Sequence, residues 1–401
     1  MFQHLEAAPP DAILGLADTF RRDPNPQKIN LTVGVYCDAS GKTPVLASVK
    51  EAERRLLETE SVKTYLAIDG IAEYGLQVRE LLFGPEHEAL ASGRAVTVQT
   101  PGGTGGLRVV GDFIHRLFPQ ARVWCSTPTW PNHPAVFRAA GMEVAWYPYY
   151  DPATGGVDVG RMLDALRTAA AGDVVCLHPC CHNPTGADPA AGDWDGIADV
   201  IFDRGLMPLL DFAYQGFGDG LREDARAVEA FCRPGAEVLI VSSFSKNFGL
   251  YRERVGALTA VAADRRTAET VLSQLKNTVR TNYSNPPSHG GAVVSTILSD
   301  ADLRRQWERE LAAMRDRING MRALFADTMQ RHAPGRDFGF IRRGRGMFSL
   351  SGLSPEQVDA LRERHSLYIV RDGRVNVAGM TADSMERLCG TIASVLCPHS
   401  L

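Results

Sequence analysis

The sequence predicts an α/β fold, with a large domain built on a mostly parallel sheet and a smaller α+β domain. At 401 residues the chain is too long for one simple core, so we expect two lobes. Short, continuous apolar runs alternate with helical stretches, which is typical of parallel strands covered on both faces. The runs predicted to be strands of the large sheet are 95–98, 123–125, 144–146, 174–177, 207–210, 238–241 and 256–259.

The segments outside this sheet have patterns of their own. Residues up to about 45 are rich in proline and turn signals, which favours an arm lying over a larger body. Apolar spacing predicts a helix over 48–57 and one long, charged helix over 301–330. Three later runs predict strands of the smaller lobe: 347–350, 367–370 and 374–377. The expected divisions are an arm with part of the small domain (1–47), a large domain (48–312) and a small C-terminal domain (313–401).

Composition excludes several classes of protein. An apolar content of 44% and a charged content of 22% are ordinary for a soluble enzyme, and the net charge is only −4. The sequence has no stripe of basic residues that would indicate a nucleic-acid partner. It also has no apolar stretch long enough to cross a bilayer. The N-terminus lacks a signal-peptide pattern, and the eight cysteines have no framework-like spacing. We therefore expect reduced thiols, no membrane partner and a cytoplasmic location.

Lys246 follows a predicted strand, in the run Ser-Phe-Ser-Lys-Asn-Phe-Gly-Leu-Tyr-Arg-Glu-Arg over 243–254. A lysine beside anion-binding groups at a strand end suits an enzyme that holds a phosphorylated aldehyde as a Schiff base. Ser243 and Arg254 can then bind the phosphate. A lone lysine after a strand is more often a surface residue, but these neighbours favour the functional interpretation.

Other polar motifs also follow predicted strands, where ligands of open parallel sheets bind. Gly102-Gly103-Thr104 precedes a helix expected from near Leu107, and glycines there let backbone N–H groups approach an anion. Asp211 follows a buried strand, where a carboxylate needs a cationic partner such as a protonated pyridine nitrogen. A helix N-cap is the alternative role for Asp211.

The run His-Pro-Cys-Cys-His-Asn-Pro-Thr-Gly over 178–186 contains metal-binding residue types. It is too compact for a tetrahedral zinc site and has no second half, so we expect no metal. Its Asn-Pro-Thr-Gly turn instead presents Asn183 at a strand end. The Ser-x-x-Lys pattern at Ser243 matches penicillin-recognising hydrolases, but their Lys-Thr-Gly motif is missing from the sequence.

Two arginines differ from the majority, which lie on predicted helices. Arg280 precedes the rigid run Thr-Asn-Tyr-Ser-Asn-Pro-Pro, and Arg374 lies in a predicted strand. A planar guanidinium in either place could bind a carboxylate through two hydrogen bonds. Each is more often a surface residue when it is considered separately.

Further motifs occur along nearly the whole chain: 12–16, 33–36, Thr64-Tyr65-Leu66, Trp130-Pro131-Asn132-His133, 182–186, 211–217 and 375–380. Together with the Lys246 run, they resemble the class I aminotransferases of the aspartate aminotransferase type, which use pyridoxal 5′-phosphate (PLP). The resemblance implies the PLP-transferase fold type I with a seven-stranded sheet. It also implies a homodimer whose active sites lie at the subunit boundary.

By this similarity, Lys246 carries the cofactor covalently and moves the proton of the substrate. Asp211 pairs with the pyridine nitrogen, Trp130 stacks on the ring, and Tyr214 and Asn183 bind its phenolic oxygen. The phosphate is surrounded by Gly102, Gly103, Thr104, Ser243, Arg254 and Tyr65 of the neighbouring subunit. Arg374, assisted by Gly34 and Asn183, binds the α-carboxylate of the substrate, and Arg280 of the neighbour binds the distal carboxylate.

The substrate is expected to be aspartate or glutamate, because an aliphatic site would leave Arg280 desolvated and unpaired. Cys37 stands where aspartate-preferring relatives usually carry lysine, and Thr64 where they usually carry asparagine. We therefore expect ping-pong transamination between L-aspartate and 2-oxoglutarate, with aromatic side activity. An aromatic amino acid aminotransferase is the alternative.

Two other classes fit less well. A dinucleotide-dependent oxidoreductase would need an acidic residue after the strand at 123–125 and would leave Lys246 unexplained. A transcription regulator that kept this fold would carry an N-terminal DNA-binding domain, for which the segment before Ser48 is too short and not basic enough.

Overall fold

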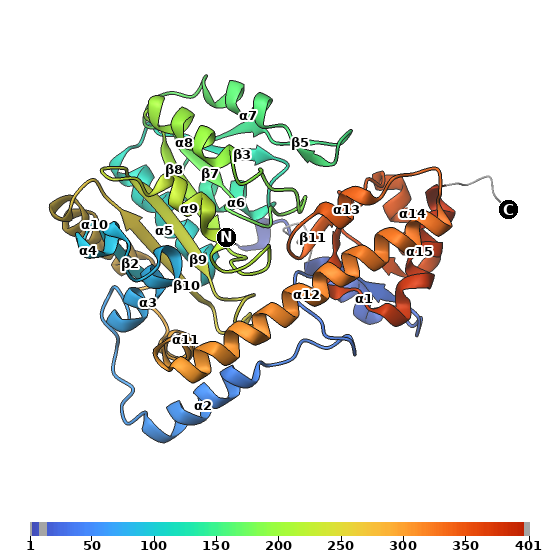
Figure 1. Ribbon diagram of the computed structural model, residues 1–401, viewed down its shortest axis with the longest axis horizontal. Coiled ribbons are helices and arrows are strands. Elements are labelled where there is room, and N and C mark those ends of the chain that lie inside the picture. The colour runs from blue at the N-terminus through green and yellow to red at the C-terminus, as the bar shows by residue number, and fades with distance from the viewer. Residues whose placement is uncertain (1, 8–13, 397–401) are drawn as a thin grey trace.

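A seven-stranded sheet forms the centre of the larger lobe in the computed structural model, which describes residues 2–7 and 14–396 (Figure 1). Every apolar run predicted for this sheet is one of its strands, so the expected α/β fold is confirmed. In spatial order the strands are β2 (Ala95–Pro101), β10 (Val255–Val261), β9 (Val238–Ser243), β8 (Met207–Phe212), β7 (Val174–Leu177), β3 (Val123–Thr127) and β4 (Val144–Pro148).

One strand of the sheet is reversed. β10 pairs antiparallel with both β2 and β9, whereas the pairs from β9 to β4 are parallel. In the register, Val255 lies opposite Pro101, and Gly256 lies opposite Ser243. The beginning of β10 therefore lies at the same edge as the ends of the other strands, and residues just before it can join the site at that edge.

Alternate residues of the central strands face opposite sides of the sheet, as the pleat requires. On β9, Leu239 and Val241 pack into one hydrophobic cluster, and Val238 and Ile240 pack into the other. The first cluster is closed by α5 (Gly102–Leu117), α6 (Asn132–Ala139) and α10 (Arg265–Asn282). The second is closed by α3 (Ala72–Phe83), α4 (Glu88–Ala91), α7 (Val159–Leu166), α8 (Asp193–Asp203), α9 (Arg226–Phe231) and α11 (Ser288–Ser299).

The expected start of the helix after β2 is wrong. We expected it near Leu107, but α5 begins at Gly102, so the glycine-rich run is itself the first turn of the helix. The reason is close packing against β9. A Cβ added at Gly106 would lie 2.8 Å from a methyl carbon of Val241, and one at Gly103 would lie 3.1 Å from Cβ of Ser243. The low helix propensity of glycine is outweighed here by this contact.

The long helix α12 (Ala301–His332) connects the two lobes, running diagonally across Figure 1 from α2 (Ala47–Thr59) and α11 to the C-terminal helices. The sequence predicted this helix over 301–330, and it runs from Ala301 to His332. Asp300 caps its first turn by accepting backbone N–H groups of Asp302 and Leu303. Because α12 passes residue 312 without a break, the domain boundaries at 47 and 312 stay a prediction.

The smaller lobe combines both ends of the chain. β1 pairs in parallel with β12, so the N-terminal segment lies beside the C-terminal part, blue beside red in Figure 1. β11 and β13 form a second, antiparallel pair, and β5 and β6 form a hairpin beyond β4. The remaining α-helices and strands are α1 (Leu14–Arg22), β1 (Ile29–Asn30), β5 (Tyr150–Asp151), β6 (Gly156–Val157), α13 (Gly339–Arg343), β11 (Phe348–Leu350), α14 (Pro355–His365), β12 (Leu367–Tyr368), β13 (Arg374–Asn376) and α15 (Ala382–Leu396).

Some sequence predictions fall outside the described residues. The start of the motif at 12–16 and the eighth cysteine, Cys397, lie there. The seven cysteines within residues 2–7 and 14–396 are free thiols. Every helix in those ranges is too short or too polar for a transmembrane span.

Candidate functional site

A cavity of about 480 Å³ opens where the strands of the large sheet end, facing the smaller lobe. This is the position at which open parallel sheets bind ligands. The predicted site residues that line it are Gly34, Gly103, Thr104, Trp130, Asn183, Asp211, Tyr214, Ser243, Lys246, Arg254 and Arg374. Residues from seven separate segments of the sequence are therefore brought together at one edge of the sheet.

Asp211 lies inside β8 and its carboxylate is held by His133. Their oxygen and Nε2 atoms are 2.9 Å apart. Burial alone would raise the pKa of Asp211, but the hydrogen bond and the charge of His133 outweigh it, so the pKa of Asp211 is lowered overall. An ionised carboxylate can only accept, so Nε2–H of His133 donates, and Nδ1 lies 2.8 Å from the hydroxyl of Thr129. Asp211 is a strand residue, so the N-cap alternative is wrong.

His178 lies beside this pair and provides a free donor. Its ring is 5.0 Å from the ring of His133, and its Nδ1 accepts the backbone N–H of Asn183 at 3.1 Å. Burial, together with the charge of His133, lowers the pKa of His178 to about 3, so the imidazole is neutral and carries its proton on Nε2. Nε2 has no hydrogen-bond partner in the described part of the chain. A ligand in the cavity can therefore accept this hydrogen bond.

Lys246 follows the end of β9, and its Nζ lies 4.9 Å from the centre of the Tyr214 ring. Burial in the cavity lowers the pKa of Lys246 to about 8 against the opposing effect of Asp211, and Arg254 and Arg374 lower it further. An amine with this pKa is partly neutral near pH 7 and can act as a nucleophile or a base. A surface lysine would not have this property.

An anion-binding cradle faces Lys246. The first turn of α5 presents the backbone N–H groups of Gly103 and Thr104, and Ser243 lies against Gly103. Arg254 directly precedes β10, and its Nη1 donates to the hydroxyl of Ser245 at 3.4 Å. Gly102 has a φ of 76°, which favours glycine, and a Cβ there would meet Nη2 of Arg254, so the guanidinium would have to move. Free N–H groups at a helix N-terminus and an arginine suit a phosphate.

Arg374 reaches the cavity from β13 in the smaller lobe and is only 2% exposed. Its Nη1 donates to the side-chain oxygen of Asn183 at 3.3 Å, and its Nη2 donates to the carbonyl of Thr32 at 3.0 Å. Its Nε has no partner among the residues that the structure describes. Burial lowers the pKa of Arg374, but a guanidinium stays charged near pH 7. An incoming carboxylate would satisfy the free donor.

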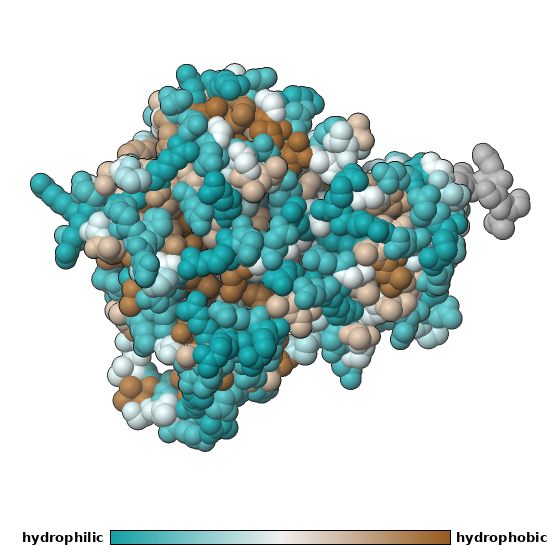
Figure 2. All heavy atoms as spheres, in the orientation of Figure 1, coloured by the Kyte–Doolittle hydropathy of each residue, from teal (hydrophilic) through white to brown (hydrophobic). Residues whose placement is uncertain are grey.

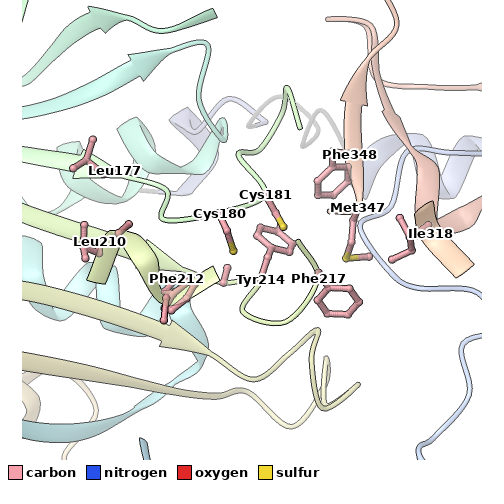
Figure 3. Packing of buried hydrophobic residues seen from close by; sticks show 14 of the residues in the cluster. Leu177, Cys180, Cys181, Leu210, Phe212, Tyr214, Phe217, Ile318, Met347 and Phe348 are labelled. Atoms are coloured by element: carbon pink, nitrogen blue, oxygen red, sulfur yellow. The ribbon is translucent and has the colours of Figure 1, made fainter. Parts of the chain in front are cut away.

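Phe348 and Tyr214 close the cavity between the two lobes. Their rings meet edge to face with centres 6.2 Å apart, and Figure 3 shows them projecting from opposite sides, Phe348 from β11 and Tyr214 from the segment after β8. The guanidinium of Arg374 lies 4.4 Å from the centre of the Phe348 ring. A Cβ at Gly34 would lie 2.6 Å from the same ring, so the glycine is required for this contact. The amide of Asn183 lies 3.5 Å from the Tyr214 hydroxyl.

Three predicted residues do not line this cavity. Gly102 lies behind Arg254, as described above. Tyr65 is 93% exposed, and Arg280 is exposed on the last turn of α10, where it bonds the hydroxyl of Ser284. The expectation that Arg280 lies off the helices is therefore wrong. The apolar positions of α10, which include Leu275 and Val279, continue the helix through Arg280 to Asn282.

Several residues that line the cavity or lie directly behind it were not predicted to have a role. His133 was quoted only as part of a motif, and His178 only as a possible metal ligand. Ser245, Tyr251 and Phe348 also line the cavity. The first four (His133, His178, Ser245 and Tyr251) stand within a few residues of predicted site residues, and this closeness in the sequence could have marked them as candidates. Phe348 comes from another lobe, and nothing local in the sequence marks it.

Within residues 2–7 and 14–396, two buried groups of side chains have the residue types of metal ligands. One is made of His133, His178 and Asp211, of which His178 and Asp211 line the cavity. The other is Cys180, Cys181 and Asp224, which lies among apolar residues behind the 178–186 turn. The carboxylate of Asp224 already accepts the backbone N–H groups of Gly216, Gly218 and Asp219, which hold it in place.

Comparison with known proteins gives one consistent result. The family described as aminotransferase class I and II matches residues 26–392. The chain is 54% identical to the aspartate aminotransferase of Escherichia coli (strain K12), over 99% of this chain and 100% of that protein. It is 48% identical to the aromatic-amino-acid aminotransferase of Pseudomonas aeruginosa, over 98% of each chain.

A solved structure agrees with these sequence matches. The crystal structure of the aromatic-amino-acid aminotransferase from Burkholderia pseudomallei, covalently bound to pyridoxal phosphate, superimposes with a TM-score of 0.96. That protein is 47% identical, and the match covers 99% of both chains. The resemblance inferred from the sequence is confirmed, and the chain belongs to the class I and II aminotransferase family.

Proposed function

We propose that this protein is a PLP-dependent aspartate aminotransferase, which transfers the amino group of L-aspartate to 2-oxoglutarate. The observation that carries the proposal is the position of Lys246. Its amine, with a pKa of about 8, lies in one cavity with an ionised carboxylate (Asp211) and a buried guanidinium (Arg374) that has a free donor. Family membership supports the same chemistry.

The residues of the cavity fit PLP. The cradle of Gly103, Thr104, Ser243 and Arg254 suits its phosphate, and Lys246 suits its aldehyde. Asp211 would hold the pyridine nitrogen in its charged form, and Tyr214 with Asn183 would bind the phenolic oxygen. Trp130 would cover one face of the ring, since it lines the cavity beside His133. The free Nε2–H of His178 gives the cavity one more donor on the Asp211 side.

When bound, PLP supplies an aldehyde that condenses with amines and a cationic ring that accepts electrons from the substrate Cα. Arg374 binds and orients the α-carboxylate, so that Cα is presented to Lys246. The amine of Lys246 is neutral often enough to take the proton from Cα, because burial has lowered its pKa. Asp211 remains ionised throughout, since His133 holds its charge. Amino acid and oxo acid then use one site in turn, which predicts ping-pong kinetics.

Aspartate is proposed as the principal amino donor. The E. coli relative named aspartate aminotransferase is 54% identical over its whole length, and Arg280 would recognise a distal carboxylate. Aromatic amino acids are the second candidate. The similar P. aeruginosa protein and the B. pseudomallei structure are aromatic-amino-acid aminotransferases. In addition, Cys37 has no positive charge at the position where aspartate-preferring relatives usually carry lysine. Both activities in one enzyme would agree with these similarities.

A homodimer is part of this proposal, since Tyr65 and Arg280 are needed at the site of another subunit. The segments that carry these two residues are in contact, because the amide of Asn285 donates to the carbonyl of Leu66 at 3.0 Å. Apolar side chains are exposed near Tyr65: Leu57 (85%) and Val62 (65%). Figure 2 shows hydrophobic atoms at the lower left, where the segment after α2 leaves the body of the protein. A second subunit would cover them. The cytoplasmic location stays a prediction.

The test uses the purified protein reconstituted with PLP. We expect a visible absorbance band that shifts on addition of aspartate, and turnover of aspartate with 2-oxoglutarate. Lys246→Ala should lose both the covalent attachment and turnover, whereas Lys50→Ala, at an exposed lysine paired with Glu53, should keep them. A protein that binds no PLP, or an active Lys246→Ala variant, would contradict the proposal. Comparing kcat/KM for aspartate and phenylalanine decides between the two donors.

A further inference from the structure

The two sides of the active-site cavity are held by different parts of the chain. Lys246 and Arg254 belong to the connection between β9 and β10, which we call the lysine loop (244–254), and Ser243 is the last residue of β9. Val33 and Gly34 line the opposite side, in an irregular segment that we call the entry segment (31–37). The distance between these two segments decides whether a substrate bound at Arg374 is presented to Lys246.

The entry segment is bound tightly to the smaller lobe. Asn376 donates from its side chain to the carbonyls of Val33 (2.7 Å) and Val35 (2.8 Å), and from its backbone to Leu31 (2.9 Å). Backbone N–H groups of Leu31 and Cys37 donate to residues 368 and 378. Arg374 adds a bond to the carbonyl of Thr32. With these bonds the entry segment and the strand of Arg374 form one unit.

Toward the lysine loop, the entry segment makes a single hydrogen bond within the described ranges 2–7 and 14–396. The backbone N–H of Tyr36 donates to the phenol oxygen of Tyr251 at 2.9 Å. Tyr36 is buried, at 8% exposed, and Tyr251 is half-buried where it lines the cavity. Tyr36 is fixed in turn by the hydroxyl of Thr43, which donates to its carbonyl at 2.9 Å.

Tyr251 is also tied to the anion-binding cradle through its backbone. Nη1 of Arg254 donates to the carbonyl of Tyr251 at 3.0 Å and to Ser245 at 3.4 Å. Arg254 has a φ of 55°, a left-handed conformation that a non-glycine residue adopts only when its surroundings hold it there. One residue therefore contacts the cradle through its carbonyl and the entry segment through its phenol.

We propose that Tyr251 is a positioning residue that latches the entry segment to the lysine loop and so sets the distance between Arg374 and Lys246. This role rests on the proposed function and deepens it. The phenol contributes one hydrogen bond and takes no part in proton transfer. Both substrates bind through an α-carboxylate at Arg374, so loss of the latch should weaken both of them by similar factors.

The direct test is amide hydrogen exchange at Tyr36 in the PLP-loaded protein. Tyr251→Phe removes only the phenol oxygen, so the Tyr36 N–H loses its acceptor, and its exchange should become at least about tenfold faster. Amides of Leu31 and Cys37, whose acceptors are backbone carbonyls of the smaller lobe, should keep their rates. Unchanged exchange at Tyr36 would overturn the latch.

The functional test measures binding and turnover separately. In Tyr251→Phe we expect KM for aspartate and for 2-oxoglutarate, and Kd for succinate as a non-reacting dicarboxylate, to rise about 3- to 10-fold. The change in kcat should be smaller than the change in KM, since Lys246 and its surroundings remain. Faster exchange at Tyr36 with unchanged KM and Kd would overturn the positioning role.

Tyr147→Phe is the matched control. Tyr147 is 1% exposed and donates one hydrogen bond to the carbonyl of Cys176 at 2.7 Å, away from the cavity. It should lower the melting temperature without changing KM, Kd or the exchange of Tyr36. An equal rise of KM in Tyr147→Phe would mean that any lost hydroxyl has this effect, and would overturn the proposal. Failure of the proposed function would appear instead as missing turnover in the unmodified protein, and the exchange experiment would still decide the latch.

Discussion

Nε2 of His133 lies 2.9 Å from the carboxylate of Asp211, and these side chains are only 0% and 9% exposed. The charge of Asp211 therefore depends on one imidazole rather than on solvent. On its other side the ring is held by Thr129, through Nδ1. The arrangement keeps an acid ionised deep in the protein, beside the proposed position of the cofactor ring.

Replacing His133 by leucine should raise the pKa of Asp211. Burial already favours the neutral acid, and the variant removes the hydrogen bond and charge that oppose burial. A raised pKa means that Asp211 loses its charge at a higher pH, so PLP should be released on acidification at a pH about one unit or more above that of the unmodified protein. Absorbance during a pH titration measures this. Thr129→Val, which keeps the imidazole, should shift the titration less, and an equal shift would contradict the assignment.

Turnover should depend on the protonation of Lys246. Below its pKa of about 8 the amine is mostly charged and cannot accept a proton, so the rate of proton removal from Cα should fall as pH decreases through that value. The primary isotope effect with α-deuterated aspartate, followed across this pH range, reports the step. Lys246→Arg stays charged at every pH and should lose at least about a thousandfold in kcat. Appreciable activity in this variant would exclude Lys246 as the base.

Arg280→Ala tests recognition of the side chain. If Arg280 of a neighbouring subunit binds the distal carboxylate, kcat/KM for aspartate should fall about 10- to 100-fold, because a charge-assisted pair is lost. Phenylalanine has no distal carboxylate, so its kcat/KM should change by less than about threefold. Arg266→Ala, at an exposed residue near the start of the same helix, is the control. Equal losses for both substrates would show that Arg280 does not bind the side chain.

Cys37→Lys should increase the preference for aspartate over phenylalanine. Cys37 is half-buried at the end of the entry segment, and an added ammonium there would attract a dicarboxylate. We expect the ratio of the two kcat/KM values to rise about 3- to 10-fold at low ionic strength, and less in salt. Cys37→Ser, which adds no charge, should leave the ratio unchanged. If the ratio did not change in Cys37→Lys, position 37 would have no role in the choice between aspartate and phenylalanine.

Arg322 should matter for stability rather than for recognition. It is 1% exposed on α12 and donates to the carbonyls of Ile341, Arg345, Gly346 and Phe348, the segment that carries Phe348 into the cavity. Arg322→Met would leave these buried carbonyls unpaired and should lower the free energy of unfolding by about 3 kcal/mol or more. Urea denaturation measures this. Arg331→Met, at an exposed residue of the same helix, should cost less than about 1 kcal/mol.

The large sheet could be predicted because its strands are continuous apolar runs with helices between them, a pattern that few other folds give. The motifs at strand ends also had to meet, since parallel strands end at one edge. The start of α5 was missed because local propensity argues against a helix that begins with glycines, and the packing against Val241 that favours it is not local.

Other parts of the site depend on contacts between distant segments. His133 and Asp211 come from different segments, and only the fold makes one the partner of the other. The pairing of the entry segment with Asn376 joins the two ends of the chain and has no signal in either segment alone. Tyr65 and Arg280 are exposed in a single chain, so the roles proposed for them would require a second subunit.

The reversed direction of β10 has a consequence for which changes of chain length the protein tolerates. Lys246 and Arg254 lie within one connection between adjacent antiparallel strands, with their ends fixed by the register of β9 and β10. An insertion inside that connection would displace Lys246 relative to Arg254. Natural variants of this protein should therefore keep the length of the connection. The turn around Gly335, between α12 and α13, has open space beside it and is free to lengthen during evolution.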